Sequence, residues 1–330
     1  MLVLDGRFVN KEHFGFSDGY SQPDIEGSGA PLIRGGGKWD ETSKTWLPIA
    51  AGEFVLGQRD EAGEIPIAPV PNLLSRNGTF MVYRKLHQKV KSFRDYLRRA
   101  GQDYPGGAEQ LAAKMVGRWR DGTPLVTSPD RPYPDRPRPR IRSAEDLAAA
   151  LTPFTDFRYG YDPGPVEPGK DRQAEGPDPY GSRCPLGSHA RRMNPRDSLG
   201  FGGTLVNRRR LLRRGLPYGD WQPEGREDDD GEHGVIMMPL NASIERQFEF
   251  VQREWANYGN DLHQGNDPDP LIGNHPPGTK MVIPGDPASG RPPHICPAIP
   301  QFVVNRGGDY FFVPSLTALR IIAEGKIEQA

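Results

Sequence analysis

The order of strand-like and helix-like segments after residue 79 is the feature that most constrains the fold of this chain. Residues 79–84 are rich in β-branched and aromatic side chains, which is typical of a strand. A helix is predicted next, because Val90, Phe93 and Leu97 recur at helical spacing. A second helix is predicted from Leu111, Met115 and Trp119.

The later part of the chain predicts more strands and two more helices. Residues 210–216 and 234–238 are each predicted to form a strand. Ser243 is a good N-cap. The helix behind it buries Ile244, Phe248, Val251 and Trp255. Residues 302–304 and 310–313 predict a hairpin around the Gly-Gly pair between them. The apolar positions of the last helix are Leu316, Leu319 and Ile322.

Together these segments give the order β-α-(α)-β-β-α-β. This is the ferredoxin-like order, an α+β fold in which helices cover one face of an antiparallel sheet. We therefore divide the chain into a loop-rich N-terminal segment, residues 1–78, and a ferredoxin-like domain, residues 79–330. The 40 glycines, the 35 prolines and a mean hydropathy of −0.67 predict long Pro/Gly-rich insertions around a modest core.

Charge and composition exclude several classes of protein. A net charge of −1 and a pI near 6.7 give no indication of a nucleic-acid partner. No stretch approaches the ~20 apolar residues that span a bilayer, and the first residues lack the pattern of a signal peptide. Cys184 and Cys296 are too few for a disulfide framework, so we expect two separate thiols and a cytoplasmic protein.

Three segments carry chemistry. In residues 184–196, His189 lies beside several arginines, in a positive field that favours the neutral, metal-binding imidazole and would hold a dianion such as a porphyrin with two propionates. In Gly-Phe-Ser-Asp-Gly, Asp18 lies between glycines that allow a tight turn. In Leu-Leu-Arg-Arg-Gly-Leu-Pro-Tyr-Gly, Arg213 ends an apolar run.

In this order, the three segments resemble the dye-decolourising peroxidases. That family has Gly-Phe-x-Asp-Gly, then His-x-Arg-Arg-x-Asn-Pro-Arg, then Arg-Arg-Gly-x-Pro-Tyr-Gly. The resemblance extends to residues 241–244 and 306–316, so that it covers nearly the whole chain. It implies a haem b peroxidase that reduces hydrogen peroxide and oxidises phenolic or dye-like aromatic donors.

The resemblance also implies two ferredoxin-like halves that form one α+β barrel, with haem held mainly by the second. Only 17 residues precede Asp18, so we expect that the first half is missing here. The chain is then a fragment, the product of a mis-started gene, or a homo-oligomer that completes its sheet by association. An uncovered sheet would favour aggregation.

The resemblance assigns the central roles to three residues. His189 corresponds to the axial iron ligand, whose other ring nitrogen is expected to donate to a carboxylate, with Asp269 as the candidate. Asp18 corresponds to the acid–base residue that moves a proton between the two peroxide oxygens. Arg213 corresponds to the distal arginine that stabilises the departing hydroxide, with Arg210 and Arg214 as rivals, because neighbouring strand positions face opposite ways.

Further residues are assigned to the haem pocket. At least one of Arg191, Arg192 and Arg196 is expected to pair with a haem propionate, and we choose Arg192. Val235 and Met237 match the two apolar residues that line the distal side in the family. Because methionine beside a peroxide-reactive haem is oxidisable, Met237 departs from the expected chemistry.

Two other functions remain open on the sequence. A non-catalytic haem-binding protein, or an inactive fragment of such an enzyme, fits the short N-terminus and Met237. A cofactor-free scaffold of ferredoxin-like fold would make the three polar motifs coincidental.

Overall fold

A four-stranded antiparallel sheet organises the molecule. The computed structural model describes residues 2–4, 7–9, 11–134, 141–160, 178–285 and 290–326. The strands lie in the order β10-β5-β7-β6, and each is antiparallel to its neighbour. Their bounds are Thr79–Gln88 for β5, Leu212–Tyr218 for β6, Gly234–Asn241 for β7 and Val303–Val313 for β10. This strand order, with helices between β5 and β6 and between β7 and β10, is the predicted ferredoxin-like topology.

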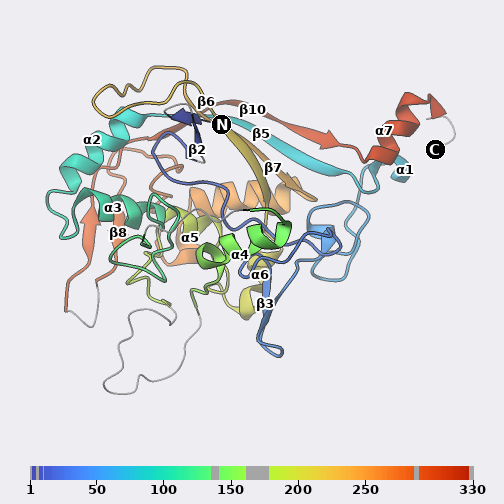
Figure 1. Ribbon diagram of the computed structural model, residues 1–330, viewed down its shortest axis with the longest axis horizontal. Helices are drawn as coiled ribbons and strands as arrows, with labels where there is room; N and C mark the ends of the chain where they lie inside the picture. Colours follow the sequence, from blue (N-terminus) through green and yellow to red (C-terminus); the bar gives the residue numbers. More distant parts are fainter. Residues whose placement is uncertain are drawn as a thin grey trace.

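Helices lie beneath the sheet as it is viewed in Figure 1. They include α5 (His189–Met193) and the π-helical turns η3 (Ile244–Glu249) and η4 (Val251–Ala256), which form the orange helix. Ser243 caps η3 as predicted, since its hydroxyl accepts a hydrogen bond from the backbone N–H of Arg246. The described residues place no helix over the upper face of the sheet.

The main hydrophobic core lies at one end of the sheet. It is built around α2 (Val90–Ala100) and α3 (Gly107–Val116), whose predicted apolar positions are buried. Phe14 and Phe16 of the N-terminal segment enter the same core, and the Phe14 ring lies 4.3 Å from that of Phe93. The N-terminal loop is therefore packed into the domain.

Short elements complete the chain. Three two-stranded hairpins are formed by β1 (Leu2–Leu4) with β2 (Arg7–Val9), β3 (Lys38–Asp40) with β4 (Thr45–Leu47), and β8 (Met281–Ile283) with β9 (His294–Cys296). The remaining helices are η1 (Ala51–Glu53), α1 (Asn72–Ser75), α4 (Ala144–Thr155), η2 (Phe201–Gly203), α6 (Thr204–Asn207), η5 (Asn260–Leu262) and α7 (Leu316–Ala323).

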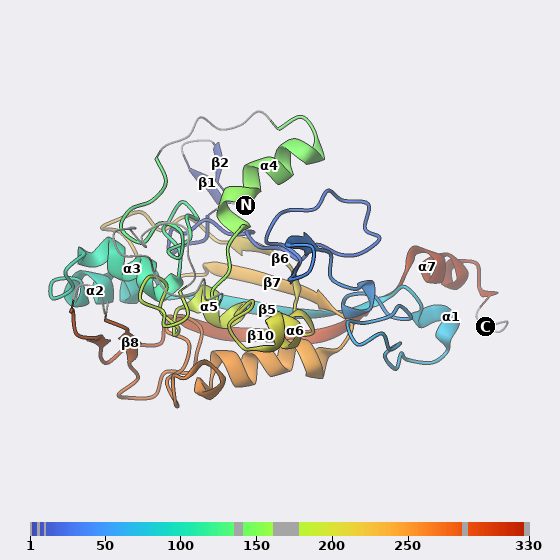
Figure 2. The ribbon, with the colours of Figure 1, turned by 90° about the horizontal axis from the view of Figure 1, so that it is seen from below.

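Figure 2 shows the structure from below, with α5, α6 and the orange helix against the sheet. Within the described residues no helix is both long and apolar enough to cross a bilayer. Cys184 and Cys296 are free and buried, as expected.

The predicted hairpin near the C-terminus is wrong. Residues 303–313 form one long strand, β10, because β5 extends to Gln88 and offers a partner along its whole length. The Gly-Gly pair does not turn the chain but lies at a register shift between Asn305 and Gly308. Gly307 has a φ of 144°, which suits glycine at such a bulge.

The predicted boundaries of two other elements are also wrong. The strand expected from residue 210 begins at Leu212, because the Arg210 carbonyl accepts a hydrogen bond from Gln247 instead of a strand partner. The second helix ends before Trp119, since Gly117 takes the left-handed conformation at its C-terminus.

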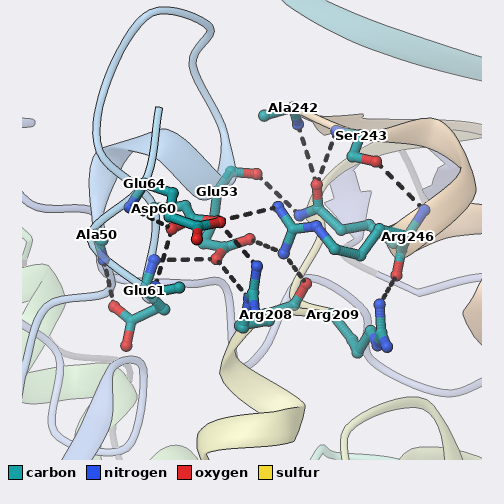
Figure 3. Close-up of polar contacts among 12 residues, drawn as sticks. Ala50, Glu53, Asp60, Glu61, Glu64, Arg208, Arg209, Ala242, Ser243 and Arg246 are labelled. Carbon is teal, nitrogen blue, oxygen red and sulfur yellow. Dashed lines mark hydrogen bonds and ion pairs between the residues drawn. The ribbon is translucent and has the colours of Figure 1, made fainter. Parts of the chain in front are cut away.

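A buried ion-pair network fixes the chain just before β6 (Figure 3). The fully buried Glu53 carboxylate accepts a hydrogen bond from Arg246 at 2.7 Å, and Arg208 donates to Asp60 at 3.0 Å. Arg246 also donates to the Arg208 carbonyl at 3.0 Å. These bonds join the loop at 50–64 to η3 and to the residues that lead into β6.

Candidate active site

The loop that carries Asp18 is fixed by its neighbours. Phe14 and Phe16 are buried on either side of Gly15, which has a φ of 96° and lies so close to Arg120 that a Cβ would be 2.9 Å from its guanidinium. Ser17 donates its backbone N–H and its hydroxyl to the Arg120 carbonyl. Asp18 follows and is exposed, so the loop presents its carboxylate outward from the core.

Arg213 lies within electrostatic reach of Asp18. Its guanidinium donates to the Tyr20 carbonyl at 2.6 Å, and its backbone N–H donates to Gln22 at 3.0 Å. Burial lowers the pKa of Arg213, and the Asp18 carboxylate acts in the opposite direction. The segment just after Asp18 therefore contacts the start of strand β6, and this brings Asp18 and Arg213, the two predicted distal residues, close together.

His189 begins α5 and is held by a buried carboxylate. Its Nδ1 lies 2.9 Å from Oδ2 of Asp269, the partner expected from the sequence. Burial alone would lower the pKa of His189, but the Asp269 carboxylate outweighs it, so that this pKa lies above its usual value. Burial alone would raise the pKa of Asp269, and His189 and further hydrogen bonds instead hold it below its usual range.

The Asp269 side chain is itself anchored. Its other oxygen, Oδ1, accepts hydrogen bonds from the backbone N–H groups of Leu271 and Ile272, at 2.8 and 3.0 Å. The carboxylate is fully buried and has both oxygens occupied. It therefore accepts a hydrogen bond from the Nδ1–H of His189 and fixes the orientation and tautomer of the ring.

The remaining nitrogen of His189 is available. The described residues give Nε2 no hydrogen-bond partner, and the His189 side chain is 29% accessible although Asp269 behind it is fully buried. Arg213 and Asp18 both influence the pKa of His189, in opposite directions. The three predicted residues thus belong to one electrostatic environment.

Four guanidinium groups converge on Ser21. Its hydroxyl accepts hydrogen bonds from Arg118 and Arg196, each at 3.0 Å, and its carbonyl lies 3.3 Å from a nitrogen of Arg210 and 3.4 Å from one of Arg213. Burial lowers the pKa of all four, to about 10 for Arg196 and about 9 for Arg210. They make this side of the site strongly positive.

A carboxyl group near this cluster is also perturbed. Burial raises the pKa of Asp24 to about 6, against the opposing effect of Arg210. Its carboxylate accepts a hydrogen bond from the Ile33 backbone at 3.0 Å. At neutral pH this carboxyl group is mostly ionised, yet one carboxylate offsets only part of the charge of four guanidinium groups, so the cluster still suits an anionic ligand.

The arginines after His189 have other partners than those expected. Arg192 is fully buried and donates to the backbone carbonyls of Trp255 and Asp267, so it ties α5 to the loop of Asp269. Arg191 is also fully buried and donates to Asp178 and the Cys184 carbonyl. Arg196 belongs to the cluster around Ser21 and is the member of the trio nearest to the expected role.

The sheet register groups Arg213 with the predicted apolar pair. Arg213 pairs with Pro239, and the residues two and four positions along β6 pair with Met237 and Val235. Since alternate residues of a strand face the same way, Arg213, Val235 and Met237 share the lower face of the sheet. Arg214 is exposed on the opposite face, which leaves it outside the site.

Several residues of this site were missed from the sequence. Ser21 and Arg118 belong to no motif, and their roles depend on contacts across about a hundred residues of chain. The sequence suggests Arg210 only as an alternative to Arg213. In the structure both guanidinium groups contact the same carbonyl oxygen, that of Ser21.

The residues present fit a haem. A histidine ring held by a carboxylate at Nδ1, with Nε2 unoccupied among the described residues, is the arrangement of a proximal histidine. The arginine cluster suits two propionate groups, and an acid beside a guanidinium suits peroxide chemistry.

Comparisons with known proteins point to one family, although no protein-family model matches the chain. The chain is 28% identical over 329 residues to dye-decolorizing peroxidase msp1 of Mycetinis scorodonius, covering 94% of this chain and 56% of that protein. It is 30% identical to the multifunctional dye peroxidase DyP2 of an Amycolatopsis species, covering 94% of this chain and 60% of that one. The chain therefore spans a little over half of the length of these curated relatives.

Solved structures agree with the sequence matches. A structure of an ancestral D-type dye-decolorizing peroxidase superposes with a TM-score of 0.69 at 30% identity, covering 94% of this chain and 62% of that one. A dye-decolorizing peroxidase in complex with 2,6-dimethoxyphenol gives a TM-score of 0.66 at 28% identity, covering 93% and 62%. The likeness confirms the predicted α+β fold.

Proposed function

Since the chain belongs to the dye-decolourising peroxidase family, we propose that it is a haem b peroxidase. It reduces hydrogen peroxide and oxidises phenolic or dye-like aromatic donors, the class to which the 2,6-dimethoxyphenol bound by a relative belongs. The observation that carries the proposal is the His189–Asp269 pair, with the second ring nitrogen unoccupied and Asp18 and Arg213 in the same electrostatic environment.

His189 would bind the iron through Nε2. Asp269 holds the proton on Nδ1 and makes the imidazole more electron-donating. Arg196, Arg210 and their neighbours around Ser21 would pair with the haem propionates. When bound, the haem supplies the redox chemistry with peroxide.

On the distal side, the acid and the guanidinium have separate tasks. The Asp18 carboxylate takes the proton from the inner peroxide oxygen and delivers it to the outer one. Arg213 keeps a fixed positive charge beside the departing oxygen and stabilises the negative charge that develops there. Val235 and Met237 would line the same side of the pocket.

Reconstitution with hemin tests the proposal. The wild-type chain should give a Soret band that His189→Ala shifts or removes. His294→Ala should leave it unchanged, since that ring packs against Tyr104. The absence of a Soret band, or one that is indifferent to His189→Ala, would refute the proposal.

A non-catalytic haem-binding protein is the second candidate. It is favoured by Met237, an oxidisable side chain on the face of Arg213. The two candidates differ in peroxide-dependent dye bleaching. A rate well above that of free hemin, lost in Arg213→Ala with haem retained, identifies the enzyme.

A further inference from the structure

His275 contacts the backbone of Asp269, the residue whose carboxylate contacts His189. Its Nε2 lies 2.7 Å from the backbone carbonyl oxygen of Asp269, and its Nδ1 lies 2.7 Å from the carbonyl oxygen of Pro300. Neither His275 nor Pro300 belongs to a sequence motif of the site. The ring therefore joins the loop of Asp269 to the segment that leads into β10.

The loop of Asp269 depends on such contacts. Asp269 lies between η5 and β8, outside any helix or strand. Its backbone N–H donates to the Ala256 carbonyl at 2.7 Å, and its own carbonyl accepts from the Gly273 N–H at 3.1 Å. Within the described part of the chain, the His275 ring is the side chain that contacts the backbone of Asp269. Because both of its ring nitrogens face carbonyl oxygens, a neutral ring donates through only one of them, and we assign that proton to Nε2, so that the ring donates to the Asp269 carbonyl.

The His275 ring has a fixed position of its own. Its backbone N–H donates to the Gln301 side chain at 2.9 Å, and its ring meets the buried Phe302 ring nearly edge-on at 6.2 Å. The Gln301 amide donates in turn to the carbonyls of Gly273 and Val303. Val303 is the first residue of β10, so these contacts connect the edge of the sheet, through Gln301 and His275, to the loop of Asp269.

We propose that His275 is a positioning residue that orients the Asp269 carboxylate toward His189. The inference rests on the proposed function, since it concerns the partner of the iron ligand. The Asp269 carboxylate is two rotatable bonds from the backbone that His275 holds. A movement of a few tenths of an ångström there alters the 2.9 Å contact with Nδ1, and with it the electron donation of the ligand.

Two substitutions of the same residue separate this role from simple packing. A glutamine amide can occupy the position of Nε2, so His275→Gln keeps a donor to the Asp269 carbonyl. An asparagine amide corresponds to Nδ1, so His275→Asn keeps a donor to Pro300 only. Both variants lose the ring and its contact with Phe302.

The readout is the iron–histidine stretching band of the reduced, hemin-reconstituted chain, measured by resonance Raman spectroscopy. Asp269→Asn serves as the reference for full loss of the carboxylate, and it should shift the band to lower frequency and weaken hemin binding about 10–100-fold. We expect a smaller shift in the same direction for His275→Asn. The band of His275→Gln should stay at the wild-type position.

Each other outcome has a definite meaning. If Asp269→Asn shifts the band but His275→Asn does not, the role of His275 is overturned while the haem site stands. Equal shifts in both His275 variants also overturn it, because packing then explains the effect. If no iron–histidine band depends on His189, the proposed function itself fails.

A further variant covers a failure of His275→Asn to fold, which thermal unfolding would reveal. Gln301→Met removes the acceptor of the His275 backbone N–H and leaves the ring in place. It should shift the band to lower frequency, and an unchanged band would count against the positioning role.

Discussion

Asp18 is the most exposed of the three central site residues, and this matches the task proposed for it. A group that exchanges a proton with a small substrate must be reached by that substrate, whereas His189 is anchored to a buried carboxylate. The exposed position also means that little of the fold depends on Asp18. Its substitution is therefore a clean probe of chemistry.

We predict that Asp18→Asn lowers the rate of peroxide-dependent dye oxidation about 10²–10⁴-fold, because an amide cannot take up the proton. Hemin binding should persist, since the iron ligand is unaffected. Stopped-flow spectroscopy of the reconstituted chain measures the reaction with peroxide. Asp220→Asn, an exposed aspartate after β6, is the control, and a rate within twofold of wild type for Asp18→Asn would contradict the assignment.

His13 makes stability dependent on pH. It is fully buried, its Nε2 donates to the Tyr218 carbonyl at 2.8 Å, and its Nδ1 has no partner within the described residues. Burial lowers its pKa to about 4, with smaller contributions from His233 and Arg94. The unfolded chain binds a proton near pH 6.5, so this stability is fully present above that pH and is lost progressively as the pH falls from about 6.5 to about 4.

On this basis the free energy of unfolding should fall by on the order of 2 kcal/mol between pH 7 and pH 5 through His13 alone. His13→Gln removes the titrating group and should make the dependence on pH correspondingly flatter. Urea denaturation at the two pH values gives both numbers. The same difference in wild type and variant would show that other groups cause the acid sensitivity.

How far single residues can be predicted from sequence depends on the range of their contacts. The sequence motifs predict Asp18, His189 and Arg213 as site residues, and in the structure the three side chains influence one another electrostatically. The hydrogen bond between His189 and Asp269 supports the carboxylate partner that the sequence suggests. The Ser21 carbonyl contacts Arg210, 189 residues further along the chain, and His275 contacts the carbonyl of Pro300, 25 residues further along, and no local sequence pattern predicts such contacts.

At the scale of elements, order was more predictable than boundaries. Apolar periodicity predicted α2 and the strands in the right sequence, because each element buries one of its own faces. The continuity of β10 could not be predicted, since it depends on the length of its partner β5. Likewise, Arg210 lies outside β6 because its carbonyl accepts a hydrogen bond from the side chain of Gln247 in η3.

The ion-pair network of Glu53 fixes the residues that precede β6, and we expect its removal to lower the free energy of unfolding substantially. Glu53 is fully buried, and burial raises its pKa against the opposing effect of Arg246. We predict that Glu53→Gln destabilises the chain by about 3–5 kcal/mol, because it leaves Arg246 and its neighbours with less compensation in the interior. Chemical denaturation at pH 7 measures the loss.

The matched control is Asp95→Asn, which removes a surface partner of Lys91 and Arg98 and should cost far less stability. If Glu53→Gln is as mild as this control, the network contributes little to stability. The position of Arg213 would then be held by its contacts with Tyr20, Ser21 and Gln22.

The whole molecule combines a well-filled lower face of the sheet with an apolar upper face. Register places Met81 of β5 beside Phe311 of β10 and Leu240 of β7, and Leu216 of β6 beside Ile236. These side chains share the face opposite to Arg213. Leu216 is 49% exposed and Phe311 44%, so apolar side chains of this upper face reach solvent on both edge strands, β6 and β10.

Such a surface binds apolar dyes and favours contact between molecules. We predict that the double variant Leu216→Lys, Phe311→Lys lowers the fluorescence of bound anilinonaphthalene sulfonate and reduces self-association in sedimentation velocity experiments, because the charges must remain hydrated. Leu73→Lys is the matched control, since Leu73 is 47% exposed but lies in α1, outside the sheet. Hemin binding should be unchanged in both variants, as His189 lies beneath the opposite face. Equal behaviour of the double variant and the control would mean that the upper face contributes nothing special to association.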